Sequence, residues 1–559
     1  MSSTENFRGM NVAEFFARHK EVAGFANPAR AIYQTIRELV ENSLDAIDGS
    51  EEGRKTAMPH IKVIVEKMEV TGKESEEKTW CRVTVEDNGI GVPHTVIPKA
   101  FGKVLFSSKY VLKQARGMYG IGVKAAVLYA QATTDSGVEV ISSTASLEDV
   151  YERKLRIDTA NNEPIISASG SWKKVAPWRG TRVSLVIECD WARAKNKVIE
   201  YMTRTAVIAP YVQITFQTPE KELYIFPRRT STIPPPPREA KPHPHGVDVE
   251  TLKQMLAETK AGTFERFLER EFQSVGKDSA VKFTKLLRKI VKDINRETPP
   301  AEVLQRFNGS LNVIVDAMKT FKFKPPHSSY LSPLGEELIE TSLKSMYKPE
   351  WAAAVRRSPR SYQGHPFIVE LGMAYGGGIQ PAEEPVLLRF ANKIPLLYEE
   401  REDVSYKIMK EIDWRQYKVE FPAPLVVLVH VVSTKIPYKG VGKESISEVP
   451  EVEQEIRNGM LELGRRLREY ISTKQRKEEV ITRILAVSKY LPEIARGLAT
   501  IEKEPYSWKP LEAGEENEIL EGLVKLVSSY IKIPGQENSE KVIREIIEVK
   551  RGGQGRRRG

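Results

Sequence analysis

The first strong pattern in the chain is an apolar stripe with helical spacing over residues 31–48. Apolar side chains recur every three or four positions, at Ile32, Ile36, Leu39, Val40, Leu44 and Ile47. This spacing predicts a helix with one buried face. Polar side chains stand beside that face at i, i+4 and i+7, in a row formed by Glu38, Asn42 and Asp45.

The polar row has the chemistry of a Mg²⁺–phosphate site. A hard cation prefers oxygen ligands, and a nearby carboxylate can orient an attacking water. A solvated helix face explains the same row equally well. The segment alone therefore leaves the choice open.

An alternating pattern follows the helix. The runs 61–65 and 81–85 read as strands, and the second alternates cleanly between apolar and polar residues. It ends at Asp87, followed by Gly89 and Gly91, which allow a turn and a close approach to a ligand. The Asp87 carboxylate is placed to accept a hydrogen bond from an exocyclic amine such as that of adenine. An Asp-Asn-Gly sequence is also a common turn, and alone it favours that simpler explanation.

A glycine-rich segment precedes the next helical run, which extends to Tyr129. Several backbone N–H groups and a helix N-terminus there suit an anion. The segment is not a Walker loop, because no Gly-Lys-Ser/Thr follows at the required spacing. It does not match a dinucleotide-binding fingerprint either. Its residues are Gly117, Met118, Tyr119, Gly120, Ile121, Gly122, Val123 and Lys124.

The fold class follows from the order of these elements. More strand-like runs occur at 138–141, 151–157 and 181–187. Helices and strands without βαβ alternation predict an α+β two-layer sandwich over residues 31–228. A proline-rich stretch around residues 233–244 then predicts a linker stiffened toward polyproline II.

The remainder of the chain first becomes helical and then mixed. Helices are expected at 249–258, 263–272 and 279–294, and their basic side chains fit a solvated face as well as a DNA contact. Strands are expected at 367–371, 386–391 and 425–432, the last apolar enough to be buried on both faces. A long charged helix should follow at 451–490, with further helices at 516–531 and 539–549.

Lys435 lies in the loop that leaves the 425–432 run. A lysine on a rigid strand end can be aimed across a domain boundary at a phosphate. Lys439 and Lys443 lie close by, so an ordinary surface lysine is the competing interpretation.

Composition adds limits to this picture. A chain of 559 residues should form several domains, since single cores rarely exceed about 250–300 residues. No apolar run approaches the roughly 20 residues of a membrane span, and no signal peptide is evident at the start. Cys81 and Cys189 are the only cysteines, which on this interpretation excludes a disulfide framework and a cysteine-based metal site. We therefore expect a reducing, cytoplasmic location.

The formal net charge of +10 permits a polyanionic partner without demonstrating one. Part of it lies in a basic tail, residues 546–559, which is predicted to be disordered.

Taken in order, the helical polar row, the Asp87 turn, the glycine-rich segment and Gly180-Thr181 resemble the Bergerat-type (GHKL) ATP site. Type II topoisomerases, ninety-kilodalton heat-shock chaperones, MutL and histidine kinases share that site. Within this superfamily the chain resembles the B subunits of archaeal-type DNA topoisomerase VI, a type IIB enzyme. The resemblance rests on residues 13–16, 24–28, 38–45, 101–110, 116–129, 391–398 and 433–444.

This resemblance implies an α+β multidomain architecture. An N-terminal strap (1–30) would precede a Bergerat-type two-layer α/β sandwich ATPase domain (31–228). A linker and a helix–two-turn–helix domain (229–307) would lead to a ribosomal-S5-domain-2-like transducer with the start of a long helix (308–470). A C-terminal helical region (471–545) and the basic tail would follow.

The resemblance also implies roles for single residues, with ATP and Mg²⁺ as cofactors. Glu38 would be the general base that activates water, Asn42 would hold Mg²⁺, and Asp45 would support them. Asp87 would accept a hydrogen bond from the adenine amine, with Thr181 beside it. Gly89 and Gly91 would form the turn that follows Asp87. Ser108, Lys109 and Gly117 to Lys124 would wrap the triphosphate. Lys435 would be the transducer lysine that senses the γ-phosphate, in preference to Lys393, because it leaves the buried strand in a Ser-Thr-Lys context.

The function implied is that of the ATP-hydrolysing component of a type II DNA topoisomerase. ATP-driven dimerisation would gate strand passage through double-stranded DNA, with a separate DNA-cleaving A subunit in an A2B2 heterotetramer. A MutL-like mismatch-repair ATPase is the main alternative, because residues 38–45 fit it equally well, although the glycine-rich segment differs from MutL's. A histidine kinase, a heat-shock chaperone and a non-enzymatic binding module fit less well.

Overall fold

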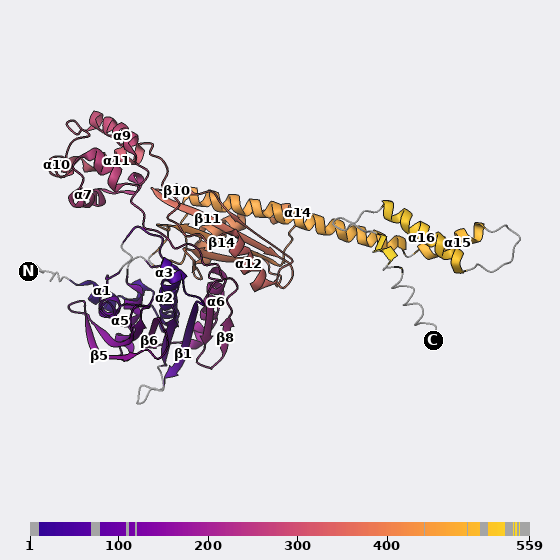
Figure 1. The fold of residues 1–559 in the computed structure, drawn as a ribbon, viewed down its shortest axis with the longest axis horizontal. Helices are drawn as coiled ribbons and strands as arrows, with labels where there is room; N and C mark the ends of the chain where they lie inside the picture. Colours follow the sequence, from indigo (N-terminus) through magenta and orange to yellow (C-terminus); the bar gives the residue numbers. More distant parts are fainter. Residues whose placement is uncertain are drawn as a thin grey trace, which may run out of the picture. The chain divides into compact units, whose positions relative to one another are not determined.

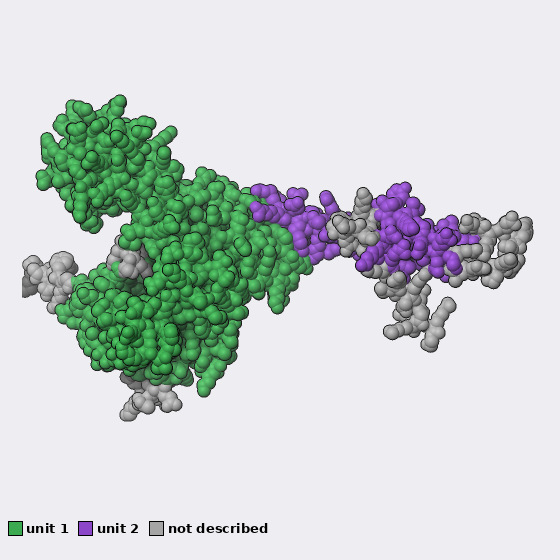
Figure 2. All heavy atoms as spheres, in the orientation of Figure 1, with its two compact units in different colours: residues 1–412, 421–463 green, residues 413–420, 464–559 purple. Residues whose placement is uncertain are grey.

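The computed structural model describes residues 10–68, 79–107, 111–117, 120–440, 442–488, 490–502, 513–530, 540–541, 543–544 and 547. The chain divides into two compact units, which Figure 2 colours separately. One unit comprises residues 1–412 and 421–463, and the other comprises residues 413–420 and 464–559. Both sheets of the protein belong to the first unit (Figure 1).

The first sheet has eight strands in the order β5-β4-β3-β6-β2-β1-β7-β8. Neighbouring strands are antiparallel except for the parallel pair β1 and β7. Buried positions of β2 alternate with half-buried or exposed ones, so one face of the sheet packs inward and the other is partly open to solvent. The strands are β1 (His60–Met68), β2 (Trp80–Asp87), β3 (Val138–Ser143), β4 (Asp149–Asp158), β5 (Glu163–Lys173), β6 (Gly180–Glu188), β7 (Gln213–Gln217) and β8 (Leu223–Phe226).

Helix α2 (Pro28–Asp48) lies at the centre of the helical layer on this sheet, in contact with α5, α6, β1, β2 and β6. The Asn27 side chain accepts a hydrogen bond from the backbone N–H of Arg30, and Pro28 stands at the first helical position, so the helix starts with favourable capping. The predicted α+β two-layer sandwich is confirmed. The other helices of this layer are α1 (Val12–Arg18), η1 (Lys20–Ala23), α3 (Glu51–Arg54), α4 (Ile97–Gly102), α5 (Gly122–Thr134) and α6 (Trp191–Ile208).

A helical insert with its own core follows the first sheet. Phe264, Phe267 and Phe283 are fully buried in that core. The core also includes Leu311, Ile314 and Met318, so the insert extends past the predicted boundary at residue 307. Its helices are η2 (Pro244–Gly246), α7 (Val249–Glu258), α8 (Phe264–Glu271), α9 (Lys277–Ile290), α10 (Pro300–Arg306), η3 (Asn308–Ser310) and α11 (Leu311–Thr320).

The second sheet has six strands, with the order β10-β11-β14-β12-β13 and β9 paired to β11. All nine residues of β14 are buried, as the apolar run predicted. The strands are β9 (Trp351–Arg356), β10 (Arg360–Tyr362), β11 (His365–Tyr375), β12 (Val386–Ala391), β13 (Ile394–Pro395) and β14 (Leu425–Ser433). The helices around them are α12 (Glu336–Tyr347), η4 (Glu400–Glu402), α13 (Val404–Glu411) and the start of α14 (Pro450–Ser488).

Two glycines show that a helix packs closely on each face of the second sheet. A Cβ on Gly372 of β11 would lie 2.6 Å from Ile339 of α12. A Cβ on Gly459 of α14 would lie 2.1 Å from Leu371, the neighbouring residue of β11. Because successive strand residues point to opposite faces, α12 and α14 pack on opposite sides of the sheet.

The second unit contains the remainder of α14, η5 (Trp414–Tyr417), α15 (Leu491–Glu502) and α16 (Ala513–Tyr530). Its small core includes Ile484, Leu491, Leu520 and Val524. Most of the helix expected at 539–549 and the basic tail fall outside the described residues. Within the described part of the chain, no helix is long and apolar enough to cross a membrane.

One expectation from composition is wrong. Cys81 on β2 and Cys189, just after β6, form a disulfide although 108 residues separate them in sequence. Pairing of β2 with β6 brings them together, and the backbone N–H of Cys189 donates to the Thr79 carbonyl at 2.9 Å. Two cysteines in a long chain do not exclude a disulfide, and their number therefore does not establish a reducing compartment.

Candidate functional site

Two adjoining cavities lie where α2 meets the loops of the first sheet and the second sheet. The larger has a volume of about 630 Å³ and the smaller about 130 Å³. They share Asn42, Ser107, Val123 and Lys124 as lining residues. Asp45, Asp87, Gly91 and Thr181 line the larger cavity, whereas Glu38 lines the smaller. The structure therefore brings most of the predicted site residues together, and Gly89 supports the turn beside them.

Asp87 forms the buried end of the larger cavity. Its Oδ1 accepts the Gly89 backbone N–H at 2.9 Å, and its Oδ2 accepts the Ser43 hydroxyl at 2.9 Å. Burial raises the pKa of Asp87 to about 6, against the lowering effect of these hydrogen bonds. A carboxyl group in this setting suits recognition of an amine donor.

The turn after Asp87 is packed too tightly for larger residues. A Cβ on Gly89 would lie 2.7 Å from the Ala46 side chain on α2. At Gly91, φ is +74° and a Cβ would lie 2.0 Å from the Ser143 carbonyl oxygen. Thr181, the strand partner of Asp87, is buried and lies 3.0 Å from the Ser142 hydroxyl, oxygen to oxygen. These contacts fix the end of the cavity around the Asp87 carboxylate.

Glu38 faces the glycine-rich segment. The Gln34 side-chain amide donates to its Oε1 at 2.8 Å and so orients the carboxylate. A Cβ on Gly122 would lie 1.7 Å from its Oε2, so the first residue of α5 must be glycine for the two to meet. Glu38 therefore stands at the N-terminal end of α5, where backbone N–H groups point outward.

The glycine-rich segment encloses the smaller cavity. Gly117, Gly120, Ile121 and Gly122 line it together with Val123 and Lys124. The buried Lys124 ammonium donates to the Phe106 carbonyl at 3.0 Å. The predicted residues Ser108, Lys109, Met118 and Tyr119 lie outside the described residues.

The structure does not bring Lys435 to either cavity. It lines a separate cavity of about 620 Å³ with residues of the helical insert, among them His245 and Asp248. In this structure the chain leaves β14 toward the insert before it turns back, and the contact of Lys435 with the phosphates stays a prediction.

Lys443, eight residues further on, lines the smaller cavity with Glu38. Its ammonium donates to the Arg116 carbonyl at 3.0 Å. The next residue, Glu444, accepts a hydrogen bond from the Arg37 guanidinium of α2 at 3.2 Å, which ties the loop to the helix. The strand end was visible in the sequence, but the course of the loop that follows it was not.

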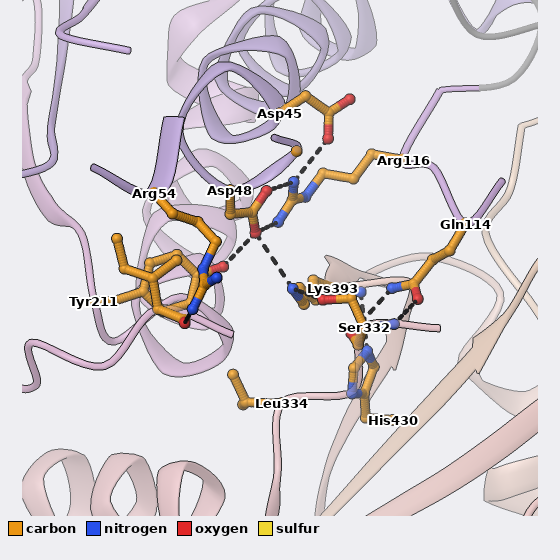
Figure 3. A network of polar contacts seen from close by, with 12 residues as sticks. Asp45, Asp48, Arg54, Gln114, Arg116, Tyr211, Ser332, Leu334, Lys393 and His430 are labelled. Carbon is orange, nitrogen blue, oxygen red and sulfur yellow. Dashed lines mark hydrogen bonds and ion pairs between the residues drawn. The ribbon is translucent and has the colours of Figure 1, made fainter. Parts of the chain in front are cut away.

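A buried ionic network borders the larger cavity (Figure 3). Both carboxylate oxygens of Asp48, the last residue of α2, accept hydrogen bonds from Arg116, each at 2.7 Å. The Tyr211 hydroxyl donates to Asp48 at 2.5 Å, and the Lys393 ammonium lies 3.4 Å from it. Arg116 also donates to Asp45 at 2.7 Å. Burial would raise the pKa of Asp48, but Arg116 and Lys393 outweigh it and hold that pKa well below its ordinary value.

The network continues into the second sheet. The Lys393 ammonium donates to the Ser332 hydroxyl at 2.9 Å, and its backbone N–H donates to His430 Nε2 at 2.9 Å. Because Nε2 accepts this bond, Nδ1 carries the proton and faces Glu370 at 2.9 Å. Glu370 in turn accepts the Leu334 N–H at 2.8 Å. Buried polar groups therefore connect α2 with the interior of the second sheet.

Sequence reasoning missed Asp48, Arg116 and Lys393 as a group. The sequence offers one indication that Asp48 belongs to the site, which is its position one helical turn beyond Asp45. Nothing in the order of residues pairs it with a lysine 345 positions later.

Comparisons with known proteins agree with this arrangement. The family model described as histidine kinase-, DNA gyrase B- and HSP90-like ATPase matches residues 27–186. The model described as topoisomerase VI B subunit, transducer, matches residues 326–483.

Relatives named as the B subunit of type 2 DNA topoisomerase 6 match nearly the whole chain, and two of them serve as examples. The one from Metallosphaera sedula is 47% identical over 540 residues, which cover 96% of this chain and 98% of the relative. One from Saccharolobus islandicus is 44% identical over 551 residues, which cover 97% and 99% respectively. A solved structure described as the N-terminal domain of a DNA repair protein is 12% identical, with a TM-score of 0.40 over 81% of this chain and 98% of the other. That likeness is too weak to favour the MutL-like alternative.

The raised pKa of Asp87 predicts a pH-dependent difference between the wild-type chain and Asp87→Asn. Well below the ordinary Asp pKa of 3.8, the carboxyl is protonated in both folded and unfolded chains. Between about pH 4 and pH 6 the unfolded chain is ionised while the folded chain still holds the proton, so the wild type progressively loses about 3 kcal/mol relative to a residue that does not titrate. Without nucleotide, the melting temperature of Asp87→Asn minus that of the wild type should increase between pH 4.5 and 7.5. A constant difference would contradict the assignment.

Proposed function

Because this chain belongs to the family of type 2 DNA topoisomerase 6 B subunits, with an ATPase domain of the GHKL class, we propose that it binds and hydrolyses ATP to drive DNA strand passage. The observation that carries the proposal is the arrangement of Glu38 and Lys443 around one cavity beside the Asp87 pocket. An acid–base group, a cation and a recess with room for a purine then line two adjoining cavities.

Adenine would occupy the larger cavity. Its exocyclic amine would donate to Asp87, and Thr181 lies beside that carboxylate to complete the contact. Asp87 must be ionised to accept from an amine with full strength, and the burial that raises its pKa also strengthens the hydrogen bond. The cavity volume of about 630 Å³ lies within the usual range for a small-molecule site.

The residues present also fit Mg²⁺. Asn42 is exposed at the junction of the two cavities, with the Asp45 carboxylate one turn along the same helix. No cluster of three or more His, Cys, Asp or Glu side chains suited to a metal occurs among the described residues, and Mg²⁺ sites that use phosphate and water oxygens do not require one. Bound there, Mg²⁺ would neutralise charge on the phosphate oxygens.

The triphosphate would lie along the glycine-rich segment, whose N–H groups and α5 N-terminus favour anions. Ser108, Lys109, Met118 and Tyr119 are proposed members of this contact. Glu38, oriented by Gln34, would take a proton from the attacking water as its oxygen bonds to the γ-phosphorus and the bond to ADP breaks. Lys443 would stabilise the charge that develops on the γ-phosphate.

We further propose that ATP joins two copies of this chain, with residues 1–30 as a strap, and that the dimer works with a DNA-cleaving A subunit in an A2B2 assembly in the cytoplasm. The ATPase, insert and transducer divisions at 31–228, 229–307 and 308–470 remain proposals, with the insert core reaching Phe323. The family supports the A subunit and double-stranded DNA as partners.

Glu38→Gln tests the hydrolytic role. The amide keeps the size of the side chain beside Gly122 but cannot take a proton, so kcat should fall by roughly 10²–10⁴-fold. Affinity for a non-hydrolysable ATP analogue should stay within about threefold of wild type. Glu139→Gln, on a residue that lines neither cavity, is the matched control and should leave both values unchanged. Unchanged turnover in Glu38→Gln would refute the role.

The choice between the two transducer lysines can be tested by comparing Lys443→Ala with Lys435→Ala. Removal of the Lys443 ammonium should lower the kcat of ATP hydrolysis by roughly 10- to 100-fold, because it acts on charge formed in the transition state. Lys435→Ala should hydrolyse ATP at the wild-type rate. A large loss of kcat in Lys435→Ala with a wild-type kcat in Lys443→Ala would instead identify Lys435 as the residue that senses the phosphate.

The proposal that a separate A subunit cleaves the DNA predicts the outcome of a DNA relaxation assay. The chain mixed with ATP, Mg²⁺, supercoiled DNA and the A subunit of a close relative should relax the DNA. The chain alone, and the mixture made with Glu38→Gln, should leave it supercoiled. Relaxation by the chain alone would contradict the need for a cleaving partner.

A further inference from the structure

Three residues immediately before the glycine-rich segment are held by the part of the chain that matches the transducer. We call residues 114–116 the lid anchor. The Gln114 side chain accepts the Ser332 backbone N–H at 2.6 Å and donates to the Ser332 carbonyl at 3.2 Å. The Asn392 amide donates to the Ala115 carbonyl at 3.3 Å. Each residue of the lid anchor thus has a partner beyond residue 330, since Lys443 binds the Arg116 carbonyl.

The side chain of Arg116 connects the lid anchor to α2 on its other side. It binds Asp48 through two hydrogen bonds and Asp45 through a third. Asp45 belongs to the same polar row as Glu38 and Asn42. A displacement of Arg116 would therefore reach both the start of the glycine-rich segment and the helix that carries the proposed catalytic base.

Lys393 completes the charge balance around Asp48. The side chains of Asp48, Arg116 and Lys393 are each only 3% exposed, so water does not screen them. Two carboxylates, Asp45 and Asp48, face two cations, Arg116 and Lys393 (Figure 3). If Lys393 moves with the second sheet, Asp48 and Arg116 must re-pair, because a buried charge is costly to leave without a partner.

Lys393 itself cannot move independently of the second sheet. Its backbone N–H is fixed by His430, and the preceding Asn392 side chain both accepts from the Ser433 N–H at 3.0 Å and donates to the Ser433 carbonyl at 2.9 Å. Although Lys393 lines the larger cavity, the contacts of its ammonium are with Asp48 and Ser332. These contacts distinguish it from a lysine that projects into the cavity.

We propose that Lys393 is a positioning residue for ATP hydrolysis, which acts through Asp48 and Arg116 to set the lid anchor according to the position of the transducer. The proposal rests on the proposed function, since it concerns regulation of the same ATP site. The transducer then influences hydrolysis through a buried ion pair, separately from the proposed contact of Lys443 with the phosphates.

The full-length chain with Lys393→Met tests this assignment. Methionine keeps the length and apolar stem of the side chain, and Asp48 retains its two hydrogen bonds from Arg116 and one from Tyr211, so the fold should persist. The kcat of ATP hydrolysis should fall roughly tenfold, within the usual range of coupling between sites. Equilibrium affinity for a non-hydrolysable ATP analogue should stay within about threefold. Lys393→Arg, which keeps the charge, should recover most of the lost kcat.

Lys344→Met is the matched control, because Lys344 lies on the surface of α12 and its ion pair is with Glu340 of its own helix. It should hydrolyse ATP at the wild-type rate. A loss of analogue affinity of 100-fold or more in Lys393→Met would make Lys393 a direct nucleotide ligand and overturn the proposal. An unchanged kcat would also overturn it. Failure of the wild-type chain to bind the analogue would instead refute the proposed function.

Discussion

The buried carboxylate of Asp48 is the constraint on which the arrangement of the site depends. A carboxylate removed from water needs several donors, and removal of one partner from such a buried pair costs about 3–5 kcal/mol. Arg116, Tyr211 and Lys393 supply those donors from three distant parts of the chain. Because the Asp48 carboxylate needs all three partners, it fixes how the glycine-rich segment, the first sheet and the second sheet meet at the end of α2.

Helix α2 therefore has two roles in the proposed mechanism. Its middle turns present Glu38, Asn42 and Asp45 to the cavities, and its last residue, Asp48, binds Arg116 just before the glycine-rich segment. Arg116 joins these roles, since it binds both Asp45 and Asp48. In the proposed mechanism, α2 thus connects the phosphate end of the site with the second sheet, alongside the loop that carries Lys443.

The sequence predicted the elements whose periodicity is strong. The helix at 31–48 and the buried strand at 425–432 were both found within a few residues of their observed bounds. β5 was missed because residues 163–173 are largely exposed and rich in Ser, Ala and Gly, so they show no apolar alternation. The predicted boundary at residue 307 leaves out α11, whose buried side chains belong to the insert core, because an apolar helix face does not reveal which core it joins.

Contacts between distant segments could not be predicted in the same way. The Cys81–Cys189 disulfide depends on the pairing of β2 with β6, and the Asp48–Lys393 contact depends on how two sheets meet. Lys435 was preferred because it stands at a strand end, whereas the turn back to Arg37 brings Lys443 to the cavity. In each case the sequence shows the type of residue but does not show which distant residue it contacts in the folded chain.

Hydrogen exchange of the wild-type chain, followed by mass spectrometry with and without a non-hydrolysable ATP analogue, tests the central claim most directly. If the lid anchor connects the nucleotide site to the second sheet, analogue binding should slow exchange at residues 330–335 and 392–396. The Ser332 and Lys393 amides lie in those peptides and are hydrogen-bonded to Gln114 and His430. Protection confined to residues 31–228, with both of these peptides unchanged, would contradict the account.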